Sequence, residues 1–431
     1  MAQATGPDYT TNEAPPPDSV EESRGLLTET FKRKLFRPSI LPRLREKLKH
    51  AAPFWRDADL ALKPRTYYLD READSGDNEA WALGGSLEFQ SGWWQERLRA
   101  GMSLYTTQKV HGPQDKDGTL LLAPGQEGFT VLGEAYLEAS LPWSMVARAG
   151  RTTFNLPYLN QQDNRMLPNT FEAYGVGRRV DQGVSFILVQ VDEMKKRNSD
   201  RFESMSEAAG LVNSDKSMST AGLSMAYGRF YAGAISHYAW DFMNTFYMEA
   251  NLAKTVTENL ALSGSVQYTD QRSIGDELDG SFDTHVVGTE LATSYRQAVL
   301  RFAYTSTDEE SGIRSPFGGY PGYASIIVKD FNRAGEDAWL VGLSYKFSAL
   351  GMPGLSTFLN YAEGNTPDRG AAASPDQDEF DITVDYHFQS RPLEGLWLRG
   401  RAAFVDQDNS VAGADDLDDY RLIVNYEVPI L

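Results

Sequence analysis

The sequence predicts an all-β fold, a transmembrane antiparallel β-barrel of about 18 strands with short periplasmic turns and long extracellular loops. Three observations lead to this prediction. Apolar and polar residues alternate with a period of two, the connections alternate between short and long, and aromatic residues make up 12% of the chain. No run approaches the roughly 18 apolar residues of a spanning helix, and the mean hydropathy is −0.44.

The alternation is clearest in four segments, residues 81–90, 97–105, 260–269 and 380–389. In the last of these, Phe380 and Ile382 alternate with Asp381 and Thr383, which places apolar side chains on one face and polar side chains on the other. A soluble β-sandwich would show the same pattern with its apolar face inward. The alternation therefore establishes strands but does not by itself establish a membrane protein.

The connections favour the barrel. Tight connections fall at residues 91–95, 140–143, 257–259 and 295–297. Long connections fall at residues 109–128, 194–221, 308–337 and 364–379. Short turns at one end and long loops at the other are typical of outer-membrane barrels. Aromatic residues stand beside the short turns, and we expect four tryptophans to form a ring at the periplasmic interface: Trp93, Trp94, Trp143 and Trp397.

The N-terminal part of the chain, residues 1–56, differs from the barrel that we expect at 57–431. Residues 1–23 are polar and proline-rich, which predicts disorder. Residues 24–55 are basic, and leucines recur in them at helical spacing. We interpret this stretch as an amphipathic segment on the periplasmic rim. A plug or gate that enters an acidic or anion-conducting lumen is the alternative.

The stretch from Ala149 to Tyr174 cannot be a simple strand, because Pro157 and Pro168 interrupt it and four asparagines favour turns. Its aromatic and aliphatic residues indicate a packed loop, which we predict to fold inward and narrow the barrel. The polar residues of this stretch that we expect to contact a solute are Arg151, Tyr158, Asp163 and Arg165.

Charge and composition exclude several functions. The net charge of −19 argues against nucleic-acid binding, because no surface that neutralises phosphates dominates. The five histidines are scattered, there is no cysteine, and no spacing resembles a metal site. The acidic turn at residues 406–410 resembles the start of a calcium loop, but Val411 stands where glycine is needed. With no nucleophile motif either, we expect neither an enzyme nor a cofactor.

Arginines are the most informative polar residues. On the predicted strands they alternate with apolar side chains, and an arginine on the lipid face at mid-depth would cost roughly 2–4 kcal/mol. We therefore expect five of them to point into the lumen: Arg148, Arg301, Arg399, Arg401 and Arg421. Together they could form a ladder of guanidinium groups that bind the carboxylate of a passing solute one after another. Alternatively they pair with lumenal carboxylates such as Glu88, Asp381 and Asp385.

Two long motifs resemble the OprD-type substrate-specific porins of Gram-negative bacteria. The first is GRTTFNLPYLNQQDNRMLPNTFE at residues 150–172, and the second is FGGYPGYASIIVKDFNRAGEDAW at residues 317–339. The segment MKKRNSDRFESMSEAAG at 194–210, LRGR at 398–401 and the closing YRLIVNY are also similar to that family. The resemblance covers residues from about 57 to the end. The terminal Leu431 and the long basic segment depart from the family pattern.

The resemblance implies an 18-stranded barrel in the bacterial outer membrane whose third and seventh extracellular loops, loops 3 and 7, fold inward to form a constriction. It implies a monomer or a weak trimer that contacts outer-membrane lipid and lipopolysaccharide, and a small carboxylate-bearing solute as substrate. Matching positions are Ser325 and Asp330 in the second motif, Arg151 and Tyr158 in the first, and Arg399, Arg401 and Arg421 in the ladder.

Three functions remain open on the sequence. A passive, substrate-selective channel with a weak site at the constriction is the interpretation that we prefer, because a channel that holds its solute tightly does not conduct. A structural or adhesion barrel with an occluded lumen is the alternative. A soluble β-rich enzyme would require that the protein stay in solution without detergent.

Overall fold

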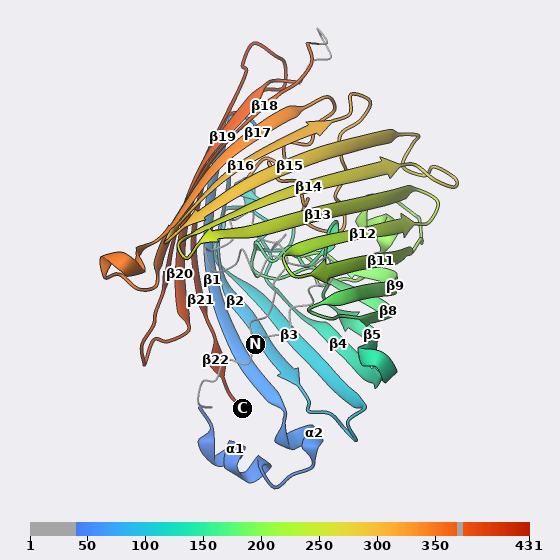
Figure 1. The fold of residues 1–431 in the computed structure, drawn as a ribbon, viewed down its shortest axis with the longest axis vertical. Helices are drawn as coiled ribbons and strands as arrows, with labels where there is room; N and C mark the ends of the chain where they lie inside the picture. The colour runs from blue at the N-terminus through green and yellow to red at the C-terminus, as the bar shows by residue number, and fades with distance from the viewer. Residues whose placement is uncertain (1–39, 369–373) are drawn as a thin grey trace.

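The computed structural model describes residues 40–368 and 374–431. Its strands close into an antiparallel barrel of 18 strands (Figure 1). The barrel strands are β1 (Asp59–Ala73), β2 (Asn78–Gln90), β3 (Leu98–His111), β4 (Phe129–Leu141), β5 (Met145–Thr152), β8 (Thr170–Arg178), β9 (Gly183–Lys195), β11 (Met218–Tyr227), β12 (Phe230–Ala239), β13 (Met243–Thr257), β14 (Leu260–Arg272), β15 (Asp283–Tyr295), β16 (Ala298–Thr307), β17 (Asp337–Lys346), β18 (Leu355–Asn365), β19 (Gln377–His387), β20 (Leu396–Gln407) and β21 (Leu417–Tyr426).

Short strands, helices and 3-10 turns accompany the barrel strands. The two-residue strands are β6 (Asn155–Leu156), β7 (Leu159–Asn160), β10 (Glu203–Ser204) and β22 (Val428–Pro429). The helices are α1 (Pro42–Leu48), α2 (Pro53–Arg56) and α3 (Met205–Ala208). Single 3-10 turns lie at Gln114–Lys116, Pro142–Ser144 and Phe347–Leu350. No helix in the described part of the chain is both long enough and apolar enough to cross a membrane.

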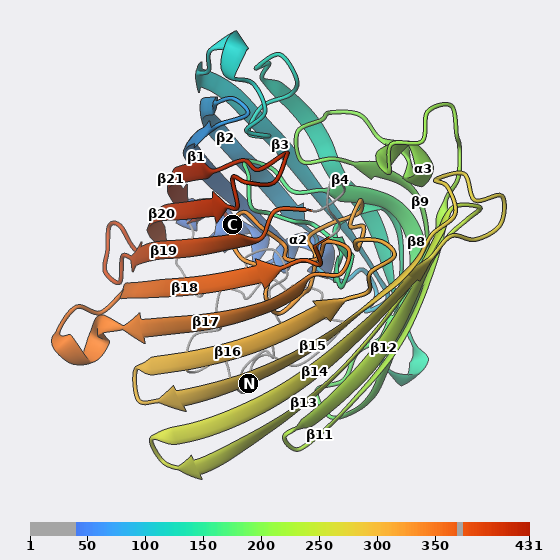
Figure 2. The same ribbon diagram turned by 90° about the horizontal axis from the view of Figure 1, so that it is seen from above.

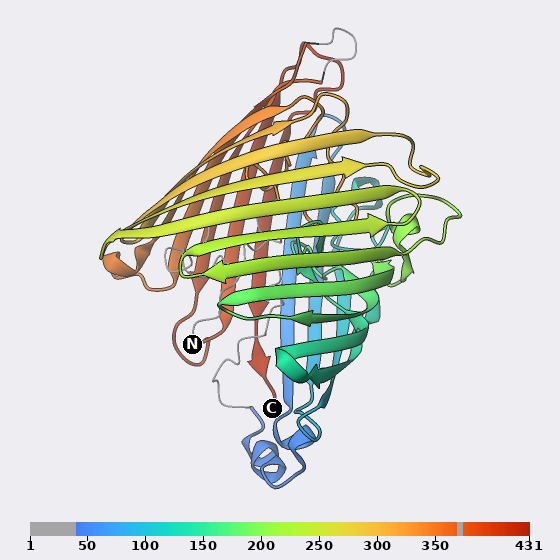
Figure 3. The ribbon, with the colours of Figure 1, turned by 45° about the vertical axis from the view of Figure 1, so that its right-hand side comes forward.

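The first and last barrel strands close the sheet. β1 pairs with β21 from Arg65 opposite Asn425 to Ala73 opposite Leu417, and β22 continues the pairing beside β1. In Figure 3, β11 to β15 cross in front of β1, as the near and far walls of a closed barrel do. Closure leaves no sheet edge, so the backbone groups of the strands are paired within the protein, as lipid requires.

Side-chain exposure follows the predicted alternation. On β21, Leu422 is 55% exposed and Tyr420 is also exposed, whereas Arg421 between them is 4% exposed. The outward residues of the other strands are mainly leucine, valine, tyrosine and phenylalanine, and the inward residues include most of the buried charges. This distribution is that of a barrel with lipid outside and polar groups inside.

The connections alternate as the sequence predicts. At one end of the barrel the strands are joined by turns such as residues 258–259 and 296–297, and we call this the short-turn end. At the other end lie loop 3 (residues 153–169), loop 4 (196–217) and loop 7 (308–336), and we call this the long-loop end. Seen from above in Figure 2, segments of these loops lie inside the ring of strands.

The four tryptophans expected in one ring all stand at turns of the short-turn end, but they do not all face the same way. Trp94 and Trp143 are exposed, at 51% and 80%. Trp93 instead lies 4.7 Å from the buried Arg99 guanidinium, and Trp397 lies 4.3 Å from that of Arg399. Residues 397 and 399 are two apart and share a strand face. Strand alternation therefore turns the Trp397 side chain inward with Arg399, away from lipid.

The described part of the N-terminal segment sits at the short-turn end. The Arg45 side chain donates to the Ala58 carbonyl at 2.8 Å, and the Gly92 amide donates to the Phe54 carbonyl at 2.9 Å. All of α1 is at the surface. Residues 1–39, which hold the predicted disordered region and much of the basic segment, lie outside the described residues.

Deleting residues 1–50 is therefore expected to leave the barrel folded. The deletion keeps α2 and every barrel strand. Within residues 40–50 it removes the Arg45 bond to the Ala58 carbonyl and the Ile40 backbone bond to Pro429. Heat-modifiable mobility in gels checks this, because a folded barrel migrates differently before and after boiling. Loss of that shift on deletion would show that the segment is integral to the fold.

Candidate functional site

Loop 3 spans the interior of the barrel. On one side, the Arg65 guanidinium on β1 binds the Asp163 carboxylate at 2.6 Å and also donates to the Arg165 carbonyl. On the other side, Tyr158 shares a hydrogen bond of 2.8 Å with Thr269 on β14. A loop that contacts both walls must cross the lumen, and the inward fold predicted for this stretch is what these contacts describe.

Loops 3 and 7 are joined by three hydrogen bonds of Asn160, which we call the Asn160 latch. The Asn160 side chain accepts from the Gly319 amide at 2.8 Å and donates to the Gly319 carbonyl at 3.0 Å. Its backbone amide donates to the Phe317 carbonyl at 3.2 Å. Between them, a methyl group added at Gly318 would lie 2.7 Å from Asn160 atoms, so only glycine allows this approach.

Carboxylates of the wall fix the middle of loop 7. Three consecutive amides donate to β19: Ile327 to Asp381 at 3.1 Å, and Val328 and Lys329 to Glu379 at 2.8 and 2.6 Å. Opposite, the Arg301 guanidinium donates to the Tyr323 carbonyl at 2.6 Å. Loop 7 is therefore held by charged groups of the wall, and its position depends on them.

Most wall arginines that we expected to form a ladder have a carboxylate partner. Arg399 forms a two-pronged bond to Asp385, with both distances 2.7 Å. The other pairs are Arg148 with Glu138 at 2.7 Å, Arg301 with Glu290 at 2.7 Å, and Arg421 with Asp419 at 2.5 Å. Arg401 donates to the Thr383 hydroxyl at 3.2 Å. The inward direction of these arginines agrees with the prediction. Their pairing with carboxylates of the wall, which was the alternative, describes them better than a ladder of unpaired guanidinium groups.

Two loop arginines differ from those of the wall. Arg165 donates from Nε to the Thr119 carbonyl at 2.8 Å and from Nη1 to the Asn164 carbonyl at 2.9 Å. Arg197 of loop 4 donates to the Asn164 side-chain oxygen. Within residues 40–368 and 374–431, no carboxylate lies at ion-pair distance from either guanidinium.

The electrostatic setting of these two arginines is cationic. Burial lowers the pKa of Arg165 well below its usual range, and the guanidinium groups of Arg421 and Arg197 lower it further. Burial, with Arg421 close by, lowers the pKa of Arg197 to about 10, so Arg197 is still charged at neutral pH. Positive charge is therefore concentrated where loops 3 and 4 meet β21.

Asp330 and Ser325 lie together on loop 7, as expected. The Ser325 hydroxyl donates to the Asp330 carboxylate at 2.6 Å. Surrounding protein raises the pKa of Asp330 by reducing its solvation, whereas Ser325 and Arg197 act in the opposite direction. The Asp330 residue as a whole is nevertheless exposed.

Three predicted site residues have other roles. Arg151 lies on β5, three residues after Arg148 and hence on the opposite face, where it pairs with Glu172 at 3.2 Å and stacks on Phe202. Tyr158 is buried against the wall and does not line the opening. Asp163 is bound by Arg65. Sequence reasoning placed Arg151 in the loop because it could not fix where β5 ends.

Sequence reasoning also missed Arg65, Arg71, Asn160 and Arg197. Arg71 binds the Asp419 carboxylate at 2.7 Å from the side opposite Arg421. The alternation of β1 could have indicated both of its arginines as lumenal. For Asn160 and Arg197 the only signal was their place in long motifs, because loop contacts between distant segments have no local pattern. Within the described residues, no group of acidic and histidine side chains could hold a metal ion.

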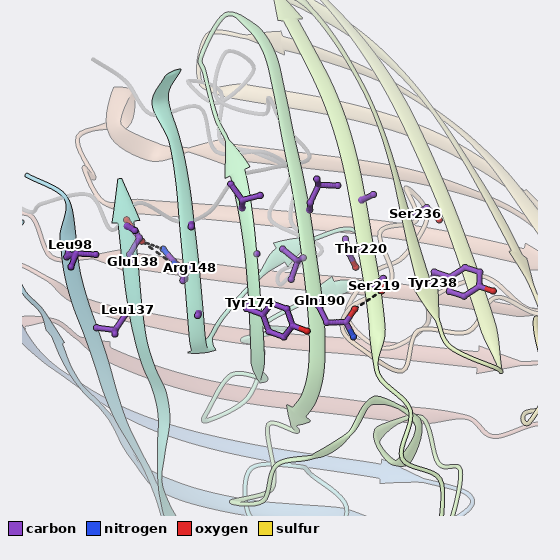
Figure 4. Close-up of a pocket in the computed structure, with 18 residues that line it drawn as sticks. Leu98, Leu137, Glu138, Arg148, Tyr174, Gln190, Ser219, Thr220, Ser236 and Tyr238 are labelled. Atoms are coloured by element: carbon purple, nitrogen blue, oxygen red, sulfur yellow. Dashed lines mark hydrogen bonds and ion pairs between the residues drawn. The ribbon is translucent and has the colours of Figure 1, made fainter. Parts of the chain in front are cut away.

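A groove with a volume of about 790 Å³ runs over β4, β5, β8, β9, β11 and β12 (Figure 4). Three of the large residues along it, Leu137, Tyr174 and Leu188, are more than half exposed and belong to the outward face of the barrel. This groove is part of the surface that meets lipid. It is separate from the solute path, even though Glu138 and Arg148 of the inner face lie beside it.

A closed barrel of 18 strands, narrowed by loops that carry charged side chains, is a substrate-specific channel of the bacterial outer membrane. The model for the outer membrane porins of the OprD family matches residues 52–430, and the chain belongs to that family. It is therefore a porin and not an enzyme. Membership in a family of channels also favours the conducting barrel over a structural one.

Relatives and solved structures agree with this assignment. The chain is 22% identical to Porin D of Pseudomonas aeruginosa over 88% of its length and 93% of that protein. It is 23% identical to the porin-like protein GalP of Pseudomonas putida, over 88% and 94%. Among solved structures, OccK9 of P. aeruginosa has a TM-score of 0.80 at 26% identity, covering 87% and 99%. OpdK of P. aeruginosa, solved with vanillate, has a TM-score of 0.78 at 23% identity, covering 86% and 99%.

Proposed function

We propose that the porin takes up small carboxylate-bearing solutes, with the long-loop end outside the cell and the short-turn end in the periplasm. One observation carries the proposal: loops 3 and 4 bring Arg165 and Arg197 next to a wall lined with arginines, and neither has a carboxylate partner in the part of the chain that the structure describes. Arginine presents a planar fork that suits a carboxylate. The vanillate found with OpdK is a carboxylate, which supports the same class of solute.

Paired wall arginines can still serve a passing acid. A solute carboxylate can compete for a guanidinium that a wall group already binds, and such an interaction stays weak enough to release. Arg399, Arg401 and Arg421 would act in this way along the wall, with Arg165, Ser325 and Asp330 on the loops. We expect Asp330 to add a preference for solutes that also carry hydroxyl or positively charged groups.

Replacing both Arg399 and Arg401 by alanine is expected to reduce entry of gluconate relative to sorbitol, a neutral solute of similar size. The change leaves Asp385 without its partner, so a negative charge faces the path of the acid. Uptake into proteoliposomes checks this. A matched variant, Arg399→Ala with Asp385→Ala, removes the pair without changing the net charge and should lose less. Equal loss for gluconate and sorbitol would contradict the arginine mechanism and leave the barrel assignment intact.

A further inference from the structure

The positive cluster at the junction of loops 3 and 4 contains more charge than one carboxylate needs. Four guanidinium groups act on one another there, those of Arg71, Arg165, Arg197 and Arg421, around the carboxylate of Asp419. Arg71 and Arg421 bind the two sides of that carboxylate, at 2.7 and 2.5 Å. Within the described residues, pairing with Asp419 therefore leaves three positive charges in the cluster.

Two further acids do not neutralise the cluster. Asp381 acts on Arg421, but it acts more strongly on Arg401, which brings a positive charge of its own. Asp330 acts on Arg197 but is hydrogen-bonded to Ser325 and lies beyond ion-pair distance. With Asp330 counted, an excess of two positive charges remains. Placing like charges together is costly unless something compensates for them, and within the described residues the hydrogen bonds of Arg165 and Arg197 go to neutral groups.

The geometry leaves donors for a ligand. Asn164 fixes both loop arginines, accepting from Arg165 through its carbonyl and from Arg197 through its side chain. Nη2 of Arg165 and two of the three nitrogens of Arg197 make no hydrogen bond within the described residues, and none of these atoms is sealed from solvent. Arg165 itself is only 8% exposed. Its remaining donor therefore belongs to a largely buried side chain and is still accessible to a ligand.

We propose that this cluster of Arg71, Arg165, Arg197 and Arg421 binds a doubly charged anion, a dicarboxylate or a phosphate monoester, in preference to a monocarboxylate. The inference rests on the proposed uptake of acids and adds the charge of the preferred solute. A dicarboxylate would place one carboxylate between Arg165 and Arg197 and the other facing Arg421, which already shares Asp419 with Arg71. A phosphate monoester would present the oxygens of its one phosphoryl group to the same guanidinium groups. Fork-shaped donors on both loops match the oxygens of either anion.

Entry of matched solutes into proteoliposomes at low concentration tests the proposal. Sorbitol, gluconate, glucarate and glucose 6-phosphate have the same number of carbons and carry no charge, one carboxylate, two carboxylates and one phosphate monoester. We expect glucarate or glucose 6-phosphate to enter faster than gluconate, and the faster of the two identifies the source of the double charge. Gluconate entering as fast as both, but faster than sorbitol, would overturn this proposal and retain acid uptake. Sorbitol matching every acid would overturn both.

Substitutions in the cluster test whether it is the source of the preference for dianions. Arg165→Gln combined with Arg197→Gln should lower the ratio of dianion to gluconate entry by about tenfold, the size expected for losing a charge-assisted hydrogen bond. Arg296→Gln removes a positive charge at a short turn and should leave the ratio unchanged. Heat-modifiable mobility shows that each variant is folded. An unchanged ratio in the folded double variant would show that the preference arises elsewhere and contradict the assigned site.

Discussion

Replacing Asn160 by alanine is expected to widen the constriction and raise the single-channel conductance. The change removes both side-chain bonds to Gly319 and leaves a buried amide and a buried carbonyl without partners. Each unsatisfied buried group costs roughly 1–3 kcal/mol, so the joint between loops 3 and 7 should open. Planar-bilayer recording measures the result as a larger and noisier current.

The control for this variant is Asn198→Ala in loop 4, where the side chain makes none of the bonds that join the loops. It should conduct like the unaltered protein. Gly318→Ala gives an independent route to the same state, because the new methyl group would push loop 7 away from Asn160. If both latch variants kept the original conductance, the opening would be set by other contacts and the role given to Asn160 would be wrong.

Replacing Glu379 by alanine should release the middle of loop 7. The Glu379 carboxylate accepts the amides of Val328 and Lys329, and both lose a charge-assisted bond in the variant. We expect new protease cleavage within loop 7 and loss of discrimination between gluconate and sorbitol. Limited proteolysis of the barrel in detergent, followed by mass spectrometry, identifies the cleaved bond.

Glu363→Ala is the matched control, since Glu363 lies on the neighbouring strand β18, accepts from the Asn365 side chain and, within the described residues, makes no hydrogen bond or ion pair to loop 7. It should be cleaved no faster than the unaltered protein. Protection of loop 7 in the Glu379 variant would mean that Arg301 and the Asn160 latch are sufficient to hold it.

The barrel could be predicted from the sequence because its determinants are local. Alternation on β19, from Phe380 to Asp385, fixes which side chains meet lipid, and turn length fixes the two ends of the molecule. For the same reason the inward direction of Arg399 and Arg421 followed from their neighbours. The period of two also explains the error at Trp397, whose position beside a short turn suggested lipid while its parity with Arg399 placed it inside.

The site could be predicted only in part. Arg165, Ser325 and Asp330 were assigned to the constriction through the resemblance of two motifs. They lie in loops 3 and 7, and their contact with a solute stays a prediction. What no local pattern contains is pairing between distant residues. Arg65 and Asp163 are separated by 98 positions, and Asn160 and Gly319 by 159. Which arginines remain without a carboxylate depends on such pairs, so Arg197 could not be recognised before the loops were placed.

Single-channel recording with gluconate tests the central claim most directly. With the unaltered protein in a planar bilayer, we predict a steady open current that gluconate interrupts briefly, more often as its concentration rises, while equimolar sorbitol does not. Brief interruptions are the signature of a weak lumenal site for the acid. A barrel with no steady current, or one that gluconate and sorbitol affect alike, would contradict a selective channel for carboxylates.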